Sequence, residues 1–177
     1  QALNDVMGEW FLGIYSSVAA PVLIVQMCAQ YIYAPLLTRF AELLHAHDKR
    51  GFTRLVLQVT LAIFALAFAF GVLFALAGEP LLVLIFGQSI APYAYLIIPL
   101  VLCTVMTAYV WFLGDVLITM RKNKMNLIGY AISFAVILAT MYPMIHAFGM
   151  NGASFAIMVA YGAAIVFFLV CVARGRG

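Results

Sequence analysis

Residues Leu55–Ala77 read LVLQVTLAIFALAFAFGVLFALA, an apolar run of 23 residues without a charged side chain. A helix that crosses a bilayer needs roughly 20 mainly apolar residues, so this run is long enough to span. Because a bilayer core offers no water to the backbone, spanning segments must be helices or strands of a closed barrel. The run is too long and continuous for a barrel strand. The sequence therefore predicts an all-α membrane protein.

Four other apolar runs have comparable length. The predicted spans are Phe11–Leu37, Leu55–Ala77, Tyr93–Thr119, Leu127–Ala147 and Gly152–Ala173. The chain is 67% hydrophobic and only 8% charged, whereas soluble domains average about 25% charged residues. We therefore expect residues 1–177 to form a single polytopic bundle of about five transmembrane helices. Because the chain begins with Gln1 and ends just after a span, we expect it to be a segment of a longer protein.

The basic residues occupy alternate gaps between these runs. They are Arg39, Lys49, Arg50 and Arg54 in the first gap, Arg121, Lys122 and Lys124 in the third, and Arg174 and Arg176 after the last span. The positive-inside rule then predicts an N-terminus outside and a cytoplasmic C-terminus. The acids Asp5, Glu9 and Glu79 fall on the outer side, where they carry little orienting weight. A net charge of +3 split among three loops does not indicate nucleic-acid binding.

Prolines fall within several predicted spans and favour kinks, because each removes a helical hydrogen bond. Pro21 and Pro35 lie in the first span, Pro99 in the third and Pro143 in the fourth. After the second span, the apolar segment Glu79–Gln88 is too short to cross a bilayer. It either lies along the outer surface or extends the second helix, and Gly87 is expected to end it.

Small residues recur every four positions in two spans and predict close helix packing. These seams are Gly152, Ala156, Ala160 and Ala164 in the fifth span, and Ala67, Gly71 and Ala75 in the second. The three cysteines lie inside spans without metal-ligand spacing, and the three histidines lie in loops or at a span end. No catalytic motif is present. We therefore expect no enzyme activity, metal or cofactor.

Asp115 is the main candidate for a functional charge within a span. It follows Thr104, Ala108 and Trp111 at helical spacing, so these four residues share one face. A carboxylate below the Trp111 ring could contact a cation, a proton or a sugar hydroxyl. Alternatively, Asp115 lies about 9 Å along the helix from Arg121 and sits in hydrated headgroups.

Three other polar side chains in the first span are candidates for substrate transport. Gln26 and Gln30 are four residues apart, so they either line a polar cavity or form hydrogen bonds between helices. Arg39 follows Pro35 at the basic end of the span. It could bind a phosphate through both guanidinium nitrogens, or it could anchor the helix by extending towards the headgroups.

Several short motifs, in order, resemble the polysaccharide exporters of the multidrug/oligosaccharidyl-lipid/polysaccharide (MOP) superfamily, of the O-antigen exporter type. They are LGIYSS at 12–17, PLLTRF at 35–40, PLLVLIFG at 80–87, and Pro143 with FGMNGAS at 148–154. The resemblance covers nearly the whole chain. It implies five helices from one lobe of a two-lobed flippase in the bacterial inner membrane.

By this resemblance, the chain moves lipid-linked oligosaccharide precursors of surface polysaccharide or lipopolysaccharide across the membrane by alternating access. Its partners would be lipid, the glycan substrate and the remaining lobe, with H⁺ or Na⁺ as coupling ion. The chain departs from the family in having few cationic residues in mid-membrane. Two alternatives stay open: a cation-coupled multidrug antiporter of the same superfamily, with Asp115 as its coupling site, and a membrane scaffold protein that transports nothing.

Overall fold

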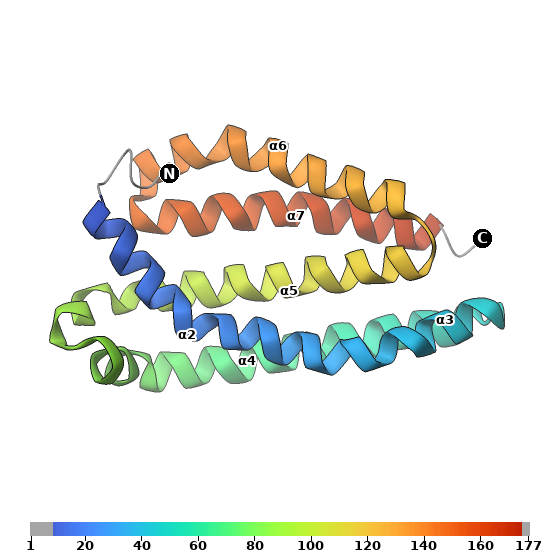
Figure 1. Ribbon diagram of the computed structural model, residues 1–177, viewed down its shortest axis with the longest axis horizontal. Helices are drawn as coiled ribbons and strands as arrows, with labels where there is room; N and C mark the ends of the chain where they lie inside the picture. Colours follow the sequence, from blue (N-terminus) through green and yellow to red (C-terminus); the bar gives the residue numbers. More distant parts are fainter. Residues whose placement is uncertain (1–8, 175–177) are drawn as a thin grey trace.

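A computed structural model describes residues 9–174, and these residues form helices joined by short turns (Figure 1). In chain order the elements are α2 (Glu9–Tyr33), η1 (Ala34–Leu36), α3 (Leu37–His45), α4 (Lys49–Phe86), η2 (Gln88–Leu96), α5 (Ile97–Thr119), α6 (Asn123–Phe148) and α7 (Met150–Arg174). The segments η1 and η2 are 3-10 helices, and no strand occurs within residues 9–174. The predicted all-α fold is confirmed.

Five helical segments are long and apolar enough to cross a membrane, as predicted. They are Ser16–His45, Lys49–Phe86, Ile97–Thr119, Asn123–Phe148 and Asn151–Arg174. The predicted outer acid Asp5 and the basic residue Arg176 lie outside the described residues. Large apolar side chains are widely exposed on the bundle surface, for example Phe68 at 76% and Leu84 at 84%. Such a surface is suited to lipid rather than to water.

Helix α4 is much longer than the predicted span. It begins after Asp48, whose side chain accepts a hydrogen bond from the Gly51 amide (2.9 Å), and it ends at Gly87, where φ is 86°. At 38 residues it is about 57 Å long, nearly twice the roughly 30 Å hydrocarbon core. The segment after Glu79 therefore extends this helix, and Gly87 ends it as expected.

The prolines act differently from one another. Pro35 lies in η1, which separates α2 from α3, so the first span is interrupted where the sequence predicts a kink. Pro99 is the third residue of α5, where backbone amides have no intrahelical acceptor, and its missing N–H therefore costs nothing. Residues 93–96 of the predicted third span lie in η2, so the change from 3-10 helix to α-helix comes just before Pro99.

Helix α5 is the central element of the bundle. About 67% of its apolar stretch is buried, against 33% or less for every other spanning segment. It packs against α2 and α4 on one side and α7 on the other, and α6 packs mainly on α7 (Figure 1). Its inner residues Phe112, Leu113, Val116 and Leu117 have no exposed surface.

The three basic regions lie at one end of the bundle. The α3–α4 turn, the α5–α6 turn and the end of α7 meet there, opposite the turns at Gly87 and Gly149 (Figure 1). This arrangement agrees with basic residues in alternate gaps. That this end faces the cytoplasm stays a prediction of the positive-inside rule.

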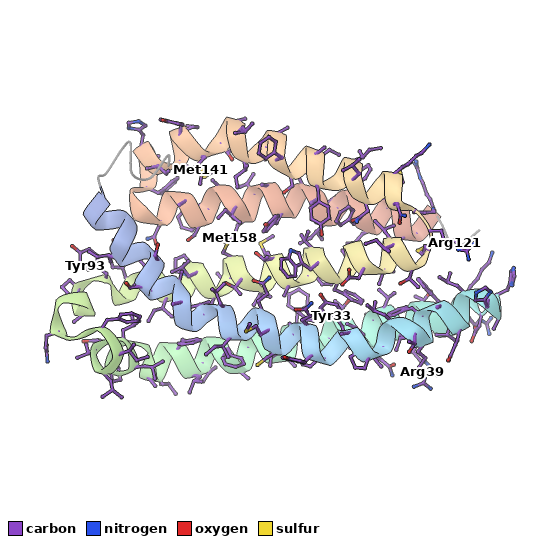
Figure 2. The ribbon with its side chains drawn as sticks, viewed as in Figure 1. Tyr33, Arg39, Tyr93, Arg121, Met141 and Met158 are labelled. Carbon is purple, nitrogen blue, oxygen red and sulfur yellow. The ribbon has the colours of Figure 1, made fainter. Side chains whose placement is uncertain are left out.

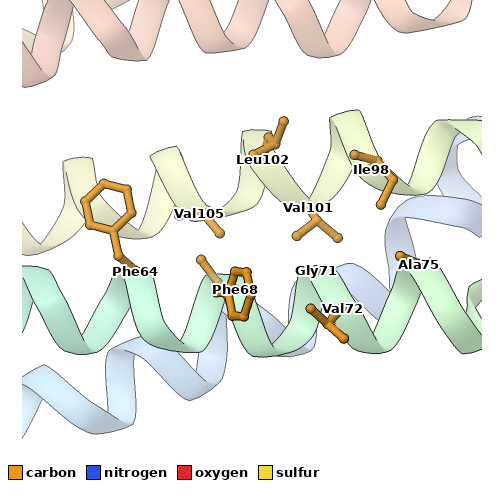
Figure 3. A pocket seen from close by; sticks show the side chains of 10 residues that line it. Phe64, Phe68, Gly71, Val72, Ala75, Ile98, Val101, Leu102 and Val105 are labelled. Carbon is orange, nitrogen blue, oxygen red and sulfur yellow. The ribbon is translucent and has the colours of Figure 1, made fainter.

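The two small-residue seams have different surroundings. In α7, Ala156, Ala160 and Ala164 are fully buried and Gly152 lies against the Met144 backbone of α6, so this predicted seam is confirmed. In α4, the Ala67–Gly71–Ala75 seam instead lines an apolar groove of about 480 Å³ between α4 and α5 (Figure 3).

These seams predict opposite effects of added methyl groups. Gly152→Ala should destabilise the fold by about 1–3 kcal/mol, because its Cβ would overlap the Met144 carbonyl group. Gly71→Ala has no atom within 4 Å of the new Cβ, so it should be neutral or stabilising by up to about 1 kcal/mol. Unfolding in mixed micelles measures both changes, and equal effects would contradict the packing described.

The turns after α3 and α5 have the same geometry. In each, two amides beyond the helix end donate to carbonyls of its last turn: His47 to Leu44 (3.2 Å), Asp48 to Leu43 (3.1 Å), Arg121 to Ile118 (2.8 Å) and Lys122 to Leu117 (2.9 Å). This is the Schellman motif, whose left-handed position usually holds glycine. Here His47 (φ 55°) and Arg121 (φ 57°) occupy that position.

Relieving this strain should stabilise the chain. Arg121→Gly and His47→Gly are each expected to add about 0.5–1 kcal/mol of unfolding free energy, because glycine adopts positive φ without steric cost. Gly87→Ala is the control that makes the opposite change, because it adds a side chain where φ is 86° and the space around the new Cβ is open. It should lower the free energy of unfolding by about 1 kcal/mol. A loss of stability in both glycine variants would show that the side chains contribute more than the strain costs.

Candidate functional site

Asp115 lies half-buried on α5 and interacts with Tyr33, the last residue of α2. Tyr33 is only 1% exposed and sits between α2 and α5 (Figure 2). Its hydroxyl is buried and makes no hydrogen bond of ordinary geometry within the described chain. The Asp115 carboxylate is nevertheless close enough to interact with it electrostatically. The first and third spans therefore meet at a polar contact inside an apolar bundle.

Helix α6 adds two polar groups next to this contact. The Tyr130 hydroxyl and the Asn126 Oδ1 lie against Gly114, since a Cβ built there would be 2.9 and 3.0 Å from them. Tyr130 also interacts electrostatically with Asp115. The Asn126 Oδ1 is buried without a hydrogen-bond partner in the described part of the chain. Three helices thus supply the Asp115 cluster, defined as Tyr33, Asp115, Asn126 and Tyr130.

Aromatic rings fix the α2 side of the cluster. The Tyr33 ring lies 5.4 Å from that of Phe112 on α5, measured between centroids. Phe40 of α3 lies 5.9 Å from Phe112 and 5.3 Å from Phe52 of α4. Such contacts contribute about 0.5–1.5 kcal/mol each beyond area burial. They hold both sides of the α2–α3 break against α4 and α5.

The Asp115 cluster contains several oxygen groups: a carboxylate, two phenolic hydroxyls and the carbonyl of an amide side chain. Hard monovalent cations, protons and sugar hydroxyls all interact favourably with such groups. Within residues 9–174, no group of three His, Cys, Asp or Glu side chains is placed to bind a metal ion. The oxygen groups of the cluster are therefore suited to binding a cation, a proton or a hydroxyl.

The other residues predicted from sequence lie apart from this cluster or at its edge. Gln26 is half-buried and Gln30 is exposed, so both lie on the face of α2 next to its buried face. Trp111 lies one turn before Asp115 and is 40% exposed. Arg39 is exposed on α3 and points away from the bundle (Figure 2). The structure brings Asp115 together with none of the other three polar candidates.

Tyr33, Asn126 and Tyr130 were not among the candidate residues predicted from the sequence. Asn126 and Tyr130 are four residues apart near the start of α6, so they share one helical face. An asparagine at the end of an apolar run is a polar group that needs a partner. That spacing was the available signal, but it does not reveal which helix the pair faces.

The fold defines the chain as a polytopic helical membrane protein. No family model, curated protein or solved structure matches this chain.

The buried Tyr33 hydroxyl leads to a stability prediction. Because it makes no ordinary hydrogen bond, Tyr33→Phe should change the free energy of unfolding by less than about 0.5 kcal/mol. Tyr109→Phe is the matched control, since the Tyr109 hydroxyl lies 3.2 Å from Thr60 Oγ1 in a hydrogen bond between α5 and α4. Its loss should cost about 1 kcal/mol. A larger cost for Tyr33→Phe than for Tyr109→Phe would mean that the Asp115 contact stabilises the fold.

Proposed function

We propose that this chain is part of a flippase that moves lipid-linked oligosaccharide across the bacterial inner membrane. The observation that carries the proposal is the Tyr33–Asp115 contact at the break between α2 and α3. Polar and ionisable groups inside apolar bundles are costly and usually mark a transport path. Here a carboxylate and an unbonded hydroxyl face each other where two helices are separated by a proline-containing segment.

The position of Tyr33 suits a moving part. It is the last residue of α2, and η1 with Pro35 follows directly. A change in the angle between α2 and α3 at this break would carry the hydroxyl towards or away from Asp115 on α5. Transporters commonly form their substrate sites at such interrupted helices. The unsatisfied Tyr33 and Asn126 oxygens would then acquire partners in another state of the transport cycle.

The resemblance to MOP-type exporters supports the same function, because three of its motifs lie at helix breaks and ends. The stretch Pro35–Phe40 covers the break between α2 and α3, Pro80–Gly87 closes α4, and Phe148–Ser154 covers the turn between α6 and α7. The complete transporter would also contain the remaining lobe, and the central path would lie between the two. Arg39, exposed on α3, would contact a lipid phosphate near the basic end.

A cation-coupled multidrug antiporter of the same superfamily is the second candidate. The oxygen groups of the Asp115 cluster favour it, since H⁺ or Na⁺ bound at the carboxylate would couple ion flow to substrate movement. In this alternative Asp115 is again essential, but the exported compound is a small amphipathic molecule. The two candidates therefore differ in the transported compound rather than in the key residue.

We predict that Asp115→Asn, in cells that depend on the full-length protein, reduces export of lipid-linked repeat units at least about tenfold, since it removes the only charge of the cluster. The repeat units should accumulate inside while surface polysaccharide falls. Glu79→Gln is the matched control, because it removes an exposed carboxylate on α4 and should leave export unchanged.

Other outcomes separate the alternatives. Normal polysaccharide together with loss of Na⁺- or H⁺-dependent dye efflux in Asp115→Asn would replace the flippase with the antiporter. If neither process changes at normal expression, a scaffold protein is the better description and the flippase proposal is wrong. Normal export in Arg39→Ala would remove Arg39 from the mechanism without affecting the role of Asp115.

A further inference from the structure

A second polar site lies at the basic end of the bundle, where the α3–α4 turn meets the α5–α6 turn. It is a pocket of about 290 Å³. Its polar lining consists of His45, His47, Thr119 and Arg121, and Ala41, Leu44 and Met120 complete it with apolar surface. The groove between α4 and α5 is lined only by apolar residues, so the pocket at the basic end differs from it in chemistry.

The backbone at this pocket is unusual. His47 and Arg121 are the two non-glycine residues with positive φ within residues 9–174, and both line the pocket. Each occupies the Schellman position that usually holds glycine, so each turn keeps a large cationic or titratable side chain in a strained conformation. Strain of this kind is concentrated at binding sites, where the surrounding structure maintains it. Two separate turns place such a residue on the same pocket.

The pocket presents side-chain donors rather than backbone donors. The amides of both turns already donate to helical carbonyls, and the Thr119 hydroxyl donates to the Asp115 carbonyl (2.9 Å). His47 Nδ1 donates to the His45 carbonyl (3.1 Å), which orients the ring and leaves Nε2 available. The Arg121 guanidinium has five N–H donors in a fixed planar arrangement that matches an oxyanion.

The charges around the pocket favour an anion. Lys122 follows Arg121, and its Nζ donates to the Cys171 carbonyl of α7 (3.3 Å), so the ammonium group stays at this end of the bundle. Of the acids in the α3–α4 region, the Asp48 carboxylate is already used by the Gly51 amide (2.9 Å), and Glu42 is exposed on α3 but does not line the pocket.

We propose that this pocket binds a phosphate group, with the Arg121 guanidinium and, in the doubly protonated imidazolium form, the His47 Nε2 as its donors. The pocket lies at the end of the apolar stretch of α5, at the level where lipid headgroups begin. The phosphate could therefore come from an anionic lipid headgroup or from soluble phosphate, and the chemistry of recognition is the same. This site is separate from Arg39 and from the Asp115 cluster, and it does not depend on the proposed transport function.

The test measures ligand binding to the complete protein in detergent by native mass spectrometry. The probes are phosphatidic acid, phosphatidylcholine and inorganic phosphate. The variants are Arg121→Asn and His47→Asn, because asparagine tolerates positive φ and so keeps each turn. Lys124→Asn is the matched control, since it removes one exposed positive charge at the same end without altering the pocket.

We expect phosphatidic acid to bind more tightly than phosphatidylcholine, and Arg121→Asn to weaken its binding at least about tenfold, since a charge-assisted hydrogen bond is lost. Lys124→Asn should change binding less than about twofold, because Lys124 does not line the pocket. Binding of inorganic phosphate with the same dependence on Arg121 would identify a soluble source. Binding of phosphatidic acid alone would identify the lipid.

Equal effects of Arg121→Asn and Lys124→Asn, or no preference for either phosphate probe over phosphatidylcholine, would overturn the proposal. If Arg121→Asn fails to fold, His47→Asn tests the same pocket with Arg121 intact and should weaken binding several-fold. Unchanged binding in that variant would likewise overturn the proposal as stated. Failure here would leave the Asp115 transport test unaffected, because the two experiments share no residue.

Discussion

The fold depends on one constraint: a peptide group inside hydrocarbon must find its hydrogen-bond partner within the protein. The chain meets this requirement with helices whose turns lie at the two ends of the bundle. Since lipid is as apolar as leucine, burial alone does not hold the helices together, and close packing and polar contacts must contribute. The small-residue seam of α7 and the ring contacts around Phe112 are the clearest examples of such packing.

Helix α5 links the packing to both candidate sites. Its buried face carries Phe112 and Leu113, its neighbouring positions Gly114 and Asp115 meet α2 and α6, and its last turn reaches the pocket at the basic end. The Thr119 hydroxyl donates to the Asp115 carbonyl, one turn away, so the two sites lie next to each other along a single helix. Both candidate sites thus lie where the most buried helix approaches the basic end.

Sequence patterns were sufficient for the features that depend on chain-local properties. Run length predicted five spans, Pro35 marked the break in the first span, and Gly87 marked the end of α4. The start of α4 was harder to predict, because a helix continues through charged residues such as Arg50 and Arg54 once it leaves the hydrocarbon.

The candidate site could be predicted only in part. The sequence identified Asp115 as a costly charge, but its contacts with Tyr33 and Tyr130 depend on how α2 and α6 are rotated about their own axes. The pocket at the basic end was not predictable, because it requires two turns distant in sequence to adopt a conformation that usually needs glycine.

The most direct test of the whole arrangement is labelling of single cysteines, in a chain lacking the native ones, by an impermeant maleimide in inverted and right-side-out vesicles. The variants Lys49→Cys and Lys124→Cys should be labelled from the cytoplasmic side, and Gln88→Cys and His146→Cys from the opposite side. Labelling of Lys49→Cys and Lys124→Cys from opposite sides of the membrane would contradict the fold.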